Sequence, residues 1–133
     1  MTAESEILRK YRTIAVVGLS SDETRDSYII SKYMQDAGYR IVPVNPGETV
    51  VLGEKAHPTV ASVPLPVEIV NVFRRSDAMP AIVDDAIAAG AKVVWMQEGI
   101  AHEEAAAKAR AAGVQVVMNS CIRSWHRRLA ANG

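Results

Sequence analysis

Five short apolar runs, rich in β-branched residues, constrain the fold of this 133-residue chain most strongly. They occupy residues 13–18, 39–44, 68–73, 92–97 and 115–118. A run that is apolar at nearly every position is typical of a parallel strand covered on both faces. Parallel strands need long crossover connections, which are usually helices. The pattern therefore predicts a sheet whose strands alternate with helices.

Segments with helical periodicity separate these runs. They cover residues 28–37, 77–89, 102–112 and 124–131, and each of the first three ends at an alanine that a glycine follows. Glycine directly after a helix supplies the left-handed conformation that closes many helix ends. Residues 46–66 hold four of the six prolines and show no clean period, so we expect connecting structure there, with a short helical turn at 59–63.

These elements predict an α/β fold with a single domain over residues 1–133. Because strand-helix-strand crossovers are right-handed, the parallel five-stranded sheet should be doubly wound, with helices on both faces. We predict the strand order 3-2-1-4-5, numbering the five runs along the chain. A ligand of such a sheet binds beyond the carboxyl ends of the strands, here beside the first strand. Function is therefore expected in the loops that follow the strands.

Charge and cysteine content narrow the classes of partner. Fifteen Lys and Arg residues balance fifteen Asp and Glu residues, so no overall positive field attracts nucleic acid or an anionic membrane, and we expect neither as a partner. Residues 1–6 lack the basic and apolar regions of a signal peptide. Cys121 is the only cysteine, which is typical of a reducing compartment. These features predict a cytoplasmic protein.

The loop after the first run is rich in hydroxyl groups. It holds Ser20, Ser21, Arg25 and Ser27, which lie before or at the start of a predicted helix. Free backbone amides and the helix dipole favour phosphate at such a position. The loop therefore indicates an anionic ligand.

Two arginines follow the third run. Arg74 and Arg75 leave the sheet near this loop, and guanidinium groups match the geometry of phosphate oxygens. Together with the loop they indicate a multiply phosphorylated ligand. The alternative is that these arginines are solvated or paired with carboxylates such as Asp22 and Asp77.

NAD fits these loops poorly. Gly18 stands after the first run, but the second and third glycines of the dinucleotide-binding fingerprint are missing. The second run ends in Val44-Asn45-Pro46, without the acidic residue that binds the adenosine ribose of NAD. Both absences disfavour NAD as the ligand.

Six short motifs carry a resemblance to a known family. They are Ile14-Ala-Val-Val-Gly-Leu-Ser20, Arg25-x-Ser27, Val44-Asn-Pro-Gly47, Leu52-Gly-Glu-Lys55, Phe73-Arg-Arg75 and Trp95-Met-Gln97. With these motifs in this order, the chain resembles the small stand-alone CoA-binding proteins, which are related to the nucleotide-binding domain of the succinyl-CoA synthetase alpha subunit. The resemblance implies a Rossmann-like domain that holds coenzyme A across the carboxyl edge of the sheet.

The resemblance also implies roles for residues at each strand end. The matched residues are Gly18, Ser20 and Ser21 at the phosphates, Arg25 and Ser27 nearby, Asn45 and Pro46 at the adenosine, and Phe73, Arg74 and Arg75 around the nucleotide. We expect Gln97, at the end of the fourth run, to face the pantetheine arm. The synthetase subunits carry a lysine shortly after strand 2, whereas this chain has a turn there. The sequence therefore leaves open whether Arg40, Lys55, Arg74 or Arg75 binds the 3′-phosphate.

The sequence offers no catalytic constellation. We find no Ser-His-Asp spacing, carboxylate pair or metal cluster, and expect His57, His102 and His126 to be structural or exposed.

We predict non-catalytic binding of coenzyme A or an acyl-CoA. The alternatives are an acyl-CoA-dependent enzyme or subunit with catalytic groups from a partner, and an NAD or thiol-based redox sensor. For Cys121, a small buried apolar residue is favoured over a reactive thiol near the CoA thiol.

Overall fold

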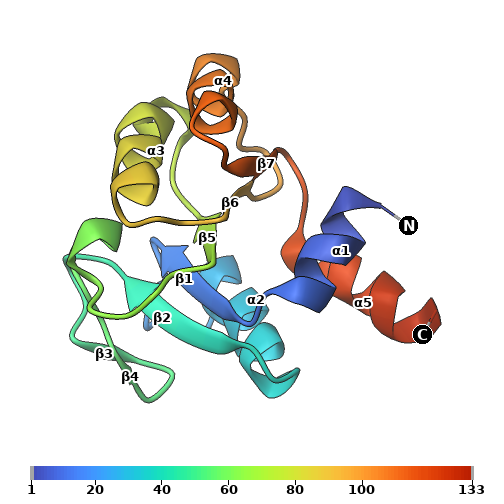
Figure 1. Cartoon of the computed structure of the whole chain (residues 1–133). Helices are drawn as coiled ribbons and strands as arrows, with labels where there is room; N and C mark the ends of the chain where they lie inside the picture. The colour runs from blue at the N-terminus through green and yellow to red at the C-terminus, as the bar shows by residue number, and fades with distance from the viewer. Residues whose placement is uncertain (1, 133) are drawn as a thin grey trace.

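Five parallel strands form the centre of the molecule in a computed structural model, which describes residues 2–132 (Figure 1). They are β1 (Thr13–Val17), β2 (Arg40–Val44), β5 (Ile69–Val72), β6 (Val93–Met96) and β7 (Gln115–Val117). Every pairing in this sheet is parallel. The predicted α/β class and the five-stranded parallel sheet are confirmed.

Helices cover both faces of the sheet (Figure 1). They are α1 (Ala3–Lys10), α2 (Asp26–Asp36), α3 (Met79–Ala88), α4 (Glu103–Ala111) and α5 (Ile122–Asn132). Side chains alternate between the faces along a strand. Ala15 and Val17 of β1 accordingly pack with α3 and α4, whereas Ile14 and Val16 pack with α1, α2 and α5. The doubly wound arrangement is confirmed by these two separate cores.

The order of the strands differs from the predicted 3-2-1-4-5. The observed order is β2-β1-β5-β6-β7, so the third strand along the chain lies between the first and the fourth, and β2 lies at the edge. Pro43 in β2 explains the difference. Its carbonyl accepts a hydrogen bond from the His57 amide on the outer side at 3.0 Å, so its missing N–H also faces outward. A proline in this position suits an edge strand and prevents regular pairing on that side.

The segment between β2 and β5 closes that edge. A two-stranded hairpin of β3 (Val50–Val51) and β4 (Glu54–Lys55) is followed by a short 3₁₀ helix, η1 (Val60–Ser62). The helical turn predicted at residues 59–63 is confirmed, with the Thr59 side chain capping it. The hairpin was not predicted, and neither was α1. No helix within residues 2–132 has the length and apolar character needed to cross a membrane.

Candidate functional site

The carboxyl ends of three strands meet at Gly18. The Gly18 amide donates to the Val44 carbonyl at 2.8 Å, and the Phe73 amide donates to the Val17 carbonyl at 2.9 Å. Gly18 has φ +89°, and a Cβ placed there would lie 2.6 Å from the Phe73 carbonyl oxygen. Only glycine therefore allows the loops after β1 and β5 to approach this closely.

A polar cleft of about 570 Å³ opens beside this contact. Its lining residues are Gly18, Ser20, Thr24, Arg25, Asp26, Ser27, Asn45, Phe73 and Arg74. Most residues predicted to hold the nucleotide are thus brought together. Thr24 and Asp26 were not predicted, because Thr24 lies in an irregular turn and Asp26 is the first residue of α2, where no periodic pattern assigns the side chain to the cleft.

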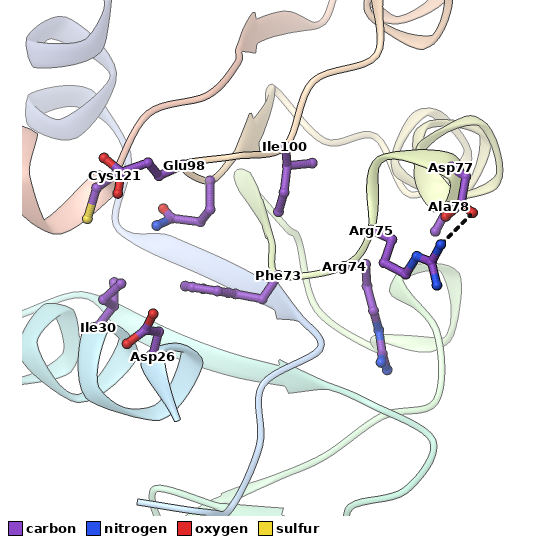
Figure 2. Close-up of a pocket in the computed structure, with 11 residues that line it drawn as sticks. Asp26, Ile30, Phe73, Arg74, Arg75, Asp77, Ala78, Glu98, Ile100 and Cys121 are labelled. Carbon is purple, nitrogen blue, oxygen red and sulfur yellow. Dashed lines mark ion pairs between the residues drawn. The ribbon is translucent and has the colours of Figure 1, made fainter. Parts of the chain in front are cut away.

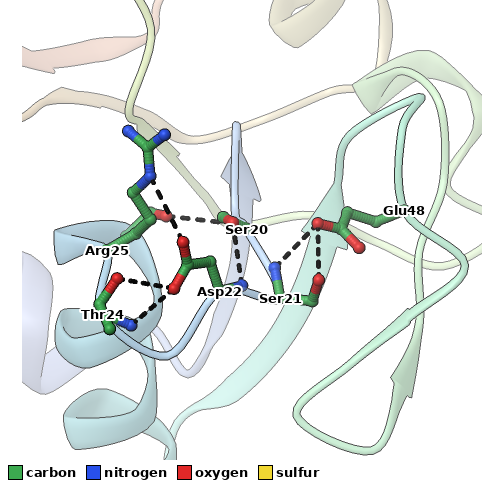
Figure 3. Close-up of polar contacts among 7 residues, drawn as sticks. Ser20, Ser21, Asp22, Thr24, Arg25 and Glu48 are labelled. Atoms are coloured by element: carbon green, nitrogen blue, oxygen red, sulfur yellow. Dashed lines mark hydrogen bonds and ion pairs between the residues drawn. The ribbon is translucent and has the colours of Figure 1, made fainter.

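The loop bordering the polar cleft is held by its own hydrogen bonds (Figure 3). The Ser27 hydroxyl accepts from the Ser20 amide at 3.1 Å, and the Ser20 hydroxyl accepts from the Asp22 amide at 3.0 Å. Hydrogen bonds from the hydroxyl and the amide of Thr24 hold the pKa of Asp22 below its usual range. Arg25 lies 3.8 Å from the Asp22 carboxylate, and both side chains are exposed. The shape of this loop is therefore held by contacts within the chain.

Helix α2 begins at the polar cleft with free backbone donors. Arg25 is its N-terminal cap and makes no side-chain capping hydrogen bond. The backbone amides of Asp26 and Ser27 have no acceptor among the residues that the structure describes. An uncapped helix start that faces a cleft can bind an anion through these amides and the helix dipole.

Arg74 lines the polar cleft and also two neighbouring cavities, which are described below. It is the only residue that lines all three. Its guanidinium donates to Asn45 Oδ1 at 3.4 Å, and Asn45 Nδ2 donates to the Leu19 carbonyl at 3.1 Å. No carboxylate in residues 2–132 forms an ion pair with Arg74. Arg75, in contrast, lies 3.8 Å from Asp77 with 89% of its side chain exposed. The pairing alternative therefore describes Arg75, as it does Arg25 beside Asp22, whereas Arg74 has no carboxylate partner among the described residues.

An apolar pocket of about 260 Å³ adjoins Arg74 on one side. Its lining residues are Val17, Val44, Pro46, Pro58, Thr59, Val60, Arg74, Ala78, Ala81, Ile82 and Asp85. Of these, only Pro46 and Arg74 were predicted. The pocket depends on η1 packing against α3, a tertiary contact that no local motif reveals.

A third cavity, here called the inner cavity, extends from Phe73 and Arg74 across the ends of β5 and β6. It has a volume of about 590 Å³. Its lining residues are Asp26, Ile30, Phe73, Arg74, Arg75, Asp77, Ala78, Gln97, Glu98, Ile100 and Cys121 (Figure 2). Gln97 therefore faces a cavity that continues from the polar cleft, as expected from its position at a strand end.

Cys121 is half-buried in the wall of the inner cavity. Burial by itself raises the pKa of its thiol, but hydrogen bonds from Ser124, the Gln97 side chain and the Arg123 backbone outweigh that effect. The pKa of Cys121 consequently lies below its usual range. This environment differs from the buried apolar position that the sequence favoured.

Ser21 lies apart from the other predicted residues. Its amide and hydroxyl both donate to the Glu48 carboxylate, at 2.8 and 3.0 Å (Figure 3). It lines none of the three cavities at this edge. Its contact with a phosphate stays a prediction, and it requires the Glu48 carboxylate to move.

Two candidates for the 3′-phosphate lie away from the polar cleft. Arg40 starts β2 opposite Thr13, at the amino end of the strand, and Lys55 belongs to β4. Both border a separate cavity on the outer side of β2. Of the original candidates, Arg74 and Arg75 are the two that lie at the ligand edge.

Two of the three histidines, His102 and His126, have structural surroundings, and His57 borders the cavity on the outer side of β2. The His102 ring accepts from the Ala105 amide at 3.1 Å and caps α4, and the His126 ring lies 2.8 Å from the Tyr33 hydroxyl. Burial and the nearby Arg12 charge lower the pKa of His126. Within residues 2–132, no group of three or more His, Cys, Asp or Glu residues has an arrangement suited to a metal ion.

Comparison with known proteins identifies the family. The chain is 44% identical over 121 residues to the "Uncharacterized protein YneT" of Bacillus subtilis, covering 91% of this chain and 90% of that protein. A hypothetical protein from Pyrococcus horikoshii superposes with a TM-score of 0.92 at 41% identity, over 96% of this chain and 89% of the other. An acetyl-coenzyme A synthetase from Ca. Korarchaeum cryptofilum, solved in complex with phosphate and ADP, superposes with a TM-score of 0.75 at 26% identity. That match covers 86% of this chain and 28% of the synthetase.

A family model described as "CoA binding domain" matches residues 12–127, which include every strand of the central sheet. The matched range contains all three cavities at the carboxyl edge. The family resemblance seen in the six sequence motifs is therefore confirmed, and the chain belongs to the CoA-binding domain family.

Proposed function

We propose that this protein binds coenzyme A or an acyl-CoA along the carboxyl edge of its sheet and does not itself catalyse a reaction. The observation that carries the proposal is the row of three adjoining cavities around Arg74, which differ in chemistry. Coenzyme A has three parts of matching chemistry: an aromatic nucleoside, a charged diphosphate, and a long pantetheine arm. Family membership supports the ligand class.

The diphosphate belongs in the polar cleft. The free amides of Asp26 and Ser27 and the positive end of the α2 dipole favour an anion there. Arg25 and Arg74 line the same cleft and supply charge-assisted hydrogen bonds. The close approach at Gly18 keeps side-chain atoms out of the floor of the cleft.

The adenosine belongs in the apolar pocket and the pantetheine arm in the inner cavity. The apolar pocket is lined mainly by aliphatic groups such as Val60 and Ile82, which suit the flat face of a base. The inner cavity combines apolar walls at Phe73 and Ile30 with the Gln97 amide, which suits a chain that alternates methylene and amide groups. Arg74 lies between the two and is the favoured partner of the 3′-phosphate.

The lining of the cavities supports binding rather than catalysis. No histidine, lysine or tyrosine lines the polar cleft, the apolar pocket or the inner cavity as the structure describes them. Histidine is the group that most often transfers protons in catalysis, although carboxylates and thiols, here Asp26, Asp77, Glu98 and Cys121, can also do so. The similarity to part of an acetyl-CoA synthetase supports the alternative that a partner supplies catalytic groups. The predicted cytoplasmic location stays a prediction.

Calorimetry with CoA, acetyl-CoA, ADP and NAD tests the proposal. We expect CoA and acetyl-CoA to bind with one site per chain, ADP to bind more weakly because it lacks the arm and the 3′-phosphate, and NAD to bind least. Tighter binding of NAD than of CoA would overturn the assignment. An acyl-CoA that is hydrolysed or transferred by the purified protein alone would contradict the non-catalytic part.

A further inference from the structure

Cys121 lies where the loop after β7 enters α5, at the wall of the inner cavity. In Figure 2, Cys121 and Ile30 stand at one side of the cavity, Arg74 and Arg75 at the other, and Phe73 between them. If the diphosphate is held near Arg74, the arm of coenzyme A runs past Phe73 toward Cys121. The terminal thiol of that arm then approaches the only cysteine of the chain.

Gln97 provides a separate indication that this end of the cavity receives a ligand. Its side chain is only 3% exposed and lines the inner cavity. Its Oε1 accepts from the Ile122 amide at 3.0 Å. Its NH₂ group faces the Cys121 thiol, whose pKa it helps to lower, and has no oxygen acceptor among the described residues. An amide donor that opens into a cavity can bind a ligand that brings an acceptor, such as an amide carbonyl.

The surroundings of Cys121 also favour its thiolate. Donors from Ser124 and the Arg123 backbone converge on the sulfur at the start of α5. A helix N-terminus stabilises a thiolate, which is the form that attacks disulfides. The Gln97 amide adds a side-chain donor from the loop that follows β6. The cavity thus places a polarised thiol next to the predicted position of the ligand sulfur.

We propose that Cys121 undergoes thiol–disulfide exchange with disulfides of coenzyme A bound in this site, an inference that rests on the proposed function. The Cys121 thiolate attacks one sulfur of CoA disulfide, and a new S–S bond joins the protein to one CoA. The original S–S bond breaks, and the second CoA leaves as a thiolate that takes up the proton lost from Cys121. The disulfide supplies the oxidising equivalent, so no other oxidant is needed.

The mixed disulfide has no internal route of reversal. Because the chain contains no second cysteine, the bound CoA remains attached until an external thiol attacks the S–S bond. The protein would therefore store the oxidation state of CoA as a reversible covalent mark.

Intact-mass measurement with CoA disulfide tests this inference. Any disulfide adduct reports Cys121, since it is the sole cysteine. We expect one adduct per chain, a rate that saturates with CoA disulfide, and a rate at least about tenfold higher than with oxidised glutathione at equal concentration, because binding holds the disulfide close. Desulfo-CoA, which lacks the thiol, should slow the reaction by competition.

Ser124→Ala is the matched variant. Removing its hydroxyl takes away one donor to the sulfur, so the pH of half-maximal adduct formation should rise. Desulfo-CoA binding measured by calorimetry separates the two proposals. If desulfo-CoA binds but CoA disulfide reacts no faster than oxidised glutathione, the exchange proposal is wrong and the binding proposal stands. If desulfo-CoA does not bind, both are wrong.

Discussion

The polar cleft and the inner cavity share Asp26, Phe73 and Arg74, but different parts of the chain build them. Backbone geometry dominates the polar cleft, through the glycine contact, the hydrogen-bonded loop and the free amides of α2. Side chains from separate strand ends dominate the inner cavity, with Gln97 and Cys121 at its far wall. The first arrangement suits a constant anionic group, and the second suits the variable end of a ligand. Substitutions in the two regions should therefore have different effects.

Gly18→Ala should have the largest effect, because it damages the backbone on which both cavities rest. A Cβ would lie 2.6 Å from the Phe73 carbonyl oxygen, and φ is +89°. Strain of this kind costs about 1–3 kcal/mol, to which the clash adds. We expect lower unfolding free energy in urea denaturation, and loss of CoA binding in calorimetry.

Gly90→Ala is the control for this comparison. Gly90 has φ +74° at the end of α3, and a Cβ there meets no atom within 4 Å. The Gly90→Ala variant should gain only the strain of the left-handed backbone conformation, and its CoA affinity should be unchanged. Equal losses of stability and binding in the two variants would show that the contact between the loops after β1 and β5 has no special role.

Arg74→Ala should weaken CoA binding strongly while leaving the fold intact. Arg74 lines all three cavities, is exposed and forms no ion pair within the described chain. Loss of a charge-assisted hydrogen bond costs about 1.5–3 kcal/mol, or roughly ten- to a hundredfold in affinity. Calorimetry with CoA measures the change.

Arg75→Ala sharpens that prediction. Arg75 lines only the inner cavity, and its guanidinium lies 3.8 Å from Asp77, so its loss should weaken binding less. Circular dichroism should show both variants folded. If Arg74→Ala binds CoA as tightly as the unaltered protein, the arginine belongs to the solvated surface and the alternative stated from the sequence is correct.

The sequence predicted the edge at which the site lies more accurately than the side chains that form it. Carboxyl ends of parallel strands gather at one edge whatever their order, so Gly18, Asn45, Phe73 and Gln97 come together. The predicted strand order was wrong because the apolar pattern of a strand does not reveal which strands lie next to it in the sheet. The sequence did contain one signal for the strand order. Pro43 has no backbone N–H to donate, which marks its strand as an edge strand.

Individual loop residues were harder to predict for a different reason. Ser20 and Ser21 are adjacent, yet one borders the polar cleft and the other bonds to Glu48. An irregular loop has no period that assigns faces to its residues. The thiol environment of Cys121 depends on Gln97, which follows β6 and lies 24 positions away in sequence. Such contacts follow from tertiary packing alone.

Asp26→Asn should have the smallest effect, and its sign is opposite to that of the other variants. The Asp26 carboxylate borders both the polar cleft and the inner cavity at the start of α2. A negative charge near a helix start stabilises the helix by about 0.3–1 kcal/mol, but it repels a phosphate placed there. We expect CoA affinity to rise severalfold at low salt while the unfolding free energy falls slightly.

Asp36→Asn is the matched control, since Asp36 ends the same helix and pairs with Lys32 at 3.2 Å, far along α2 from the cleft. It removes the same charge from the protein, so any change in affinity that depends on net charge alone appears in both variants. The gain from Asp26→Asn should shrink as salt is raised from low to physiological concentration. Dissolved ions weaken the repulsion between exposed charges, and the distance over which this repulsion acts falls to about 10 Å at 0.1 M salt. An affinity that Asp26→Asn leaves unchanged at low salt, or that Asp36→Asn raises equally, would mean that the diphosphate does not lie at the start of α2.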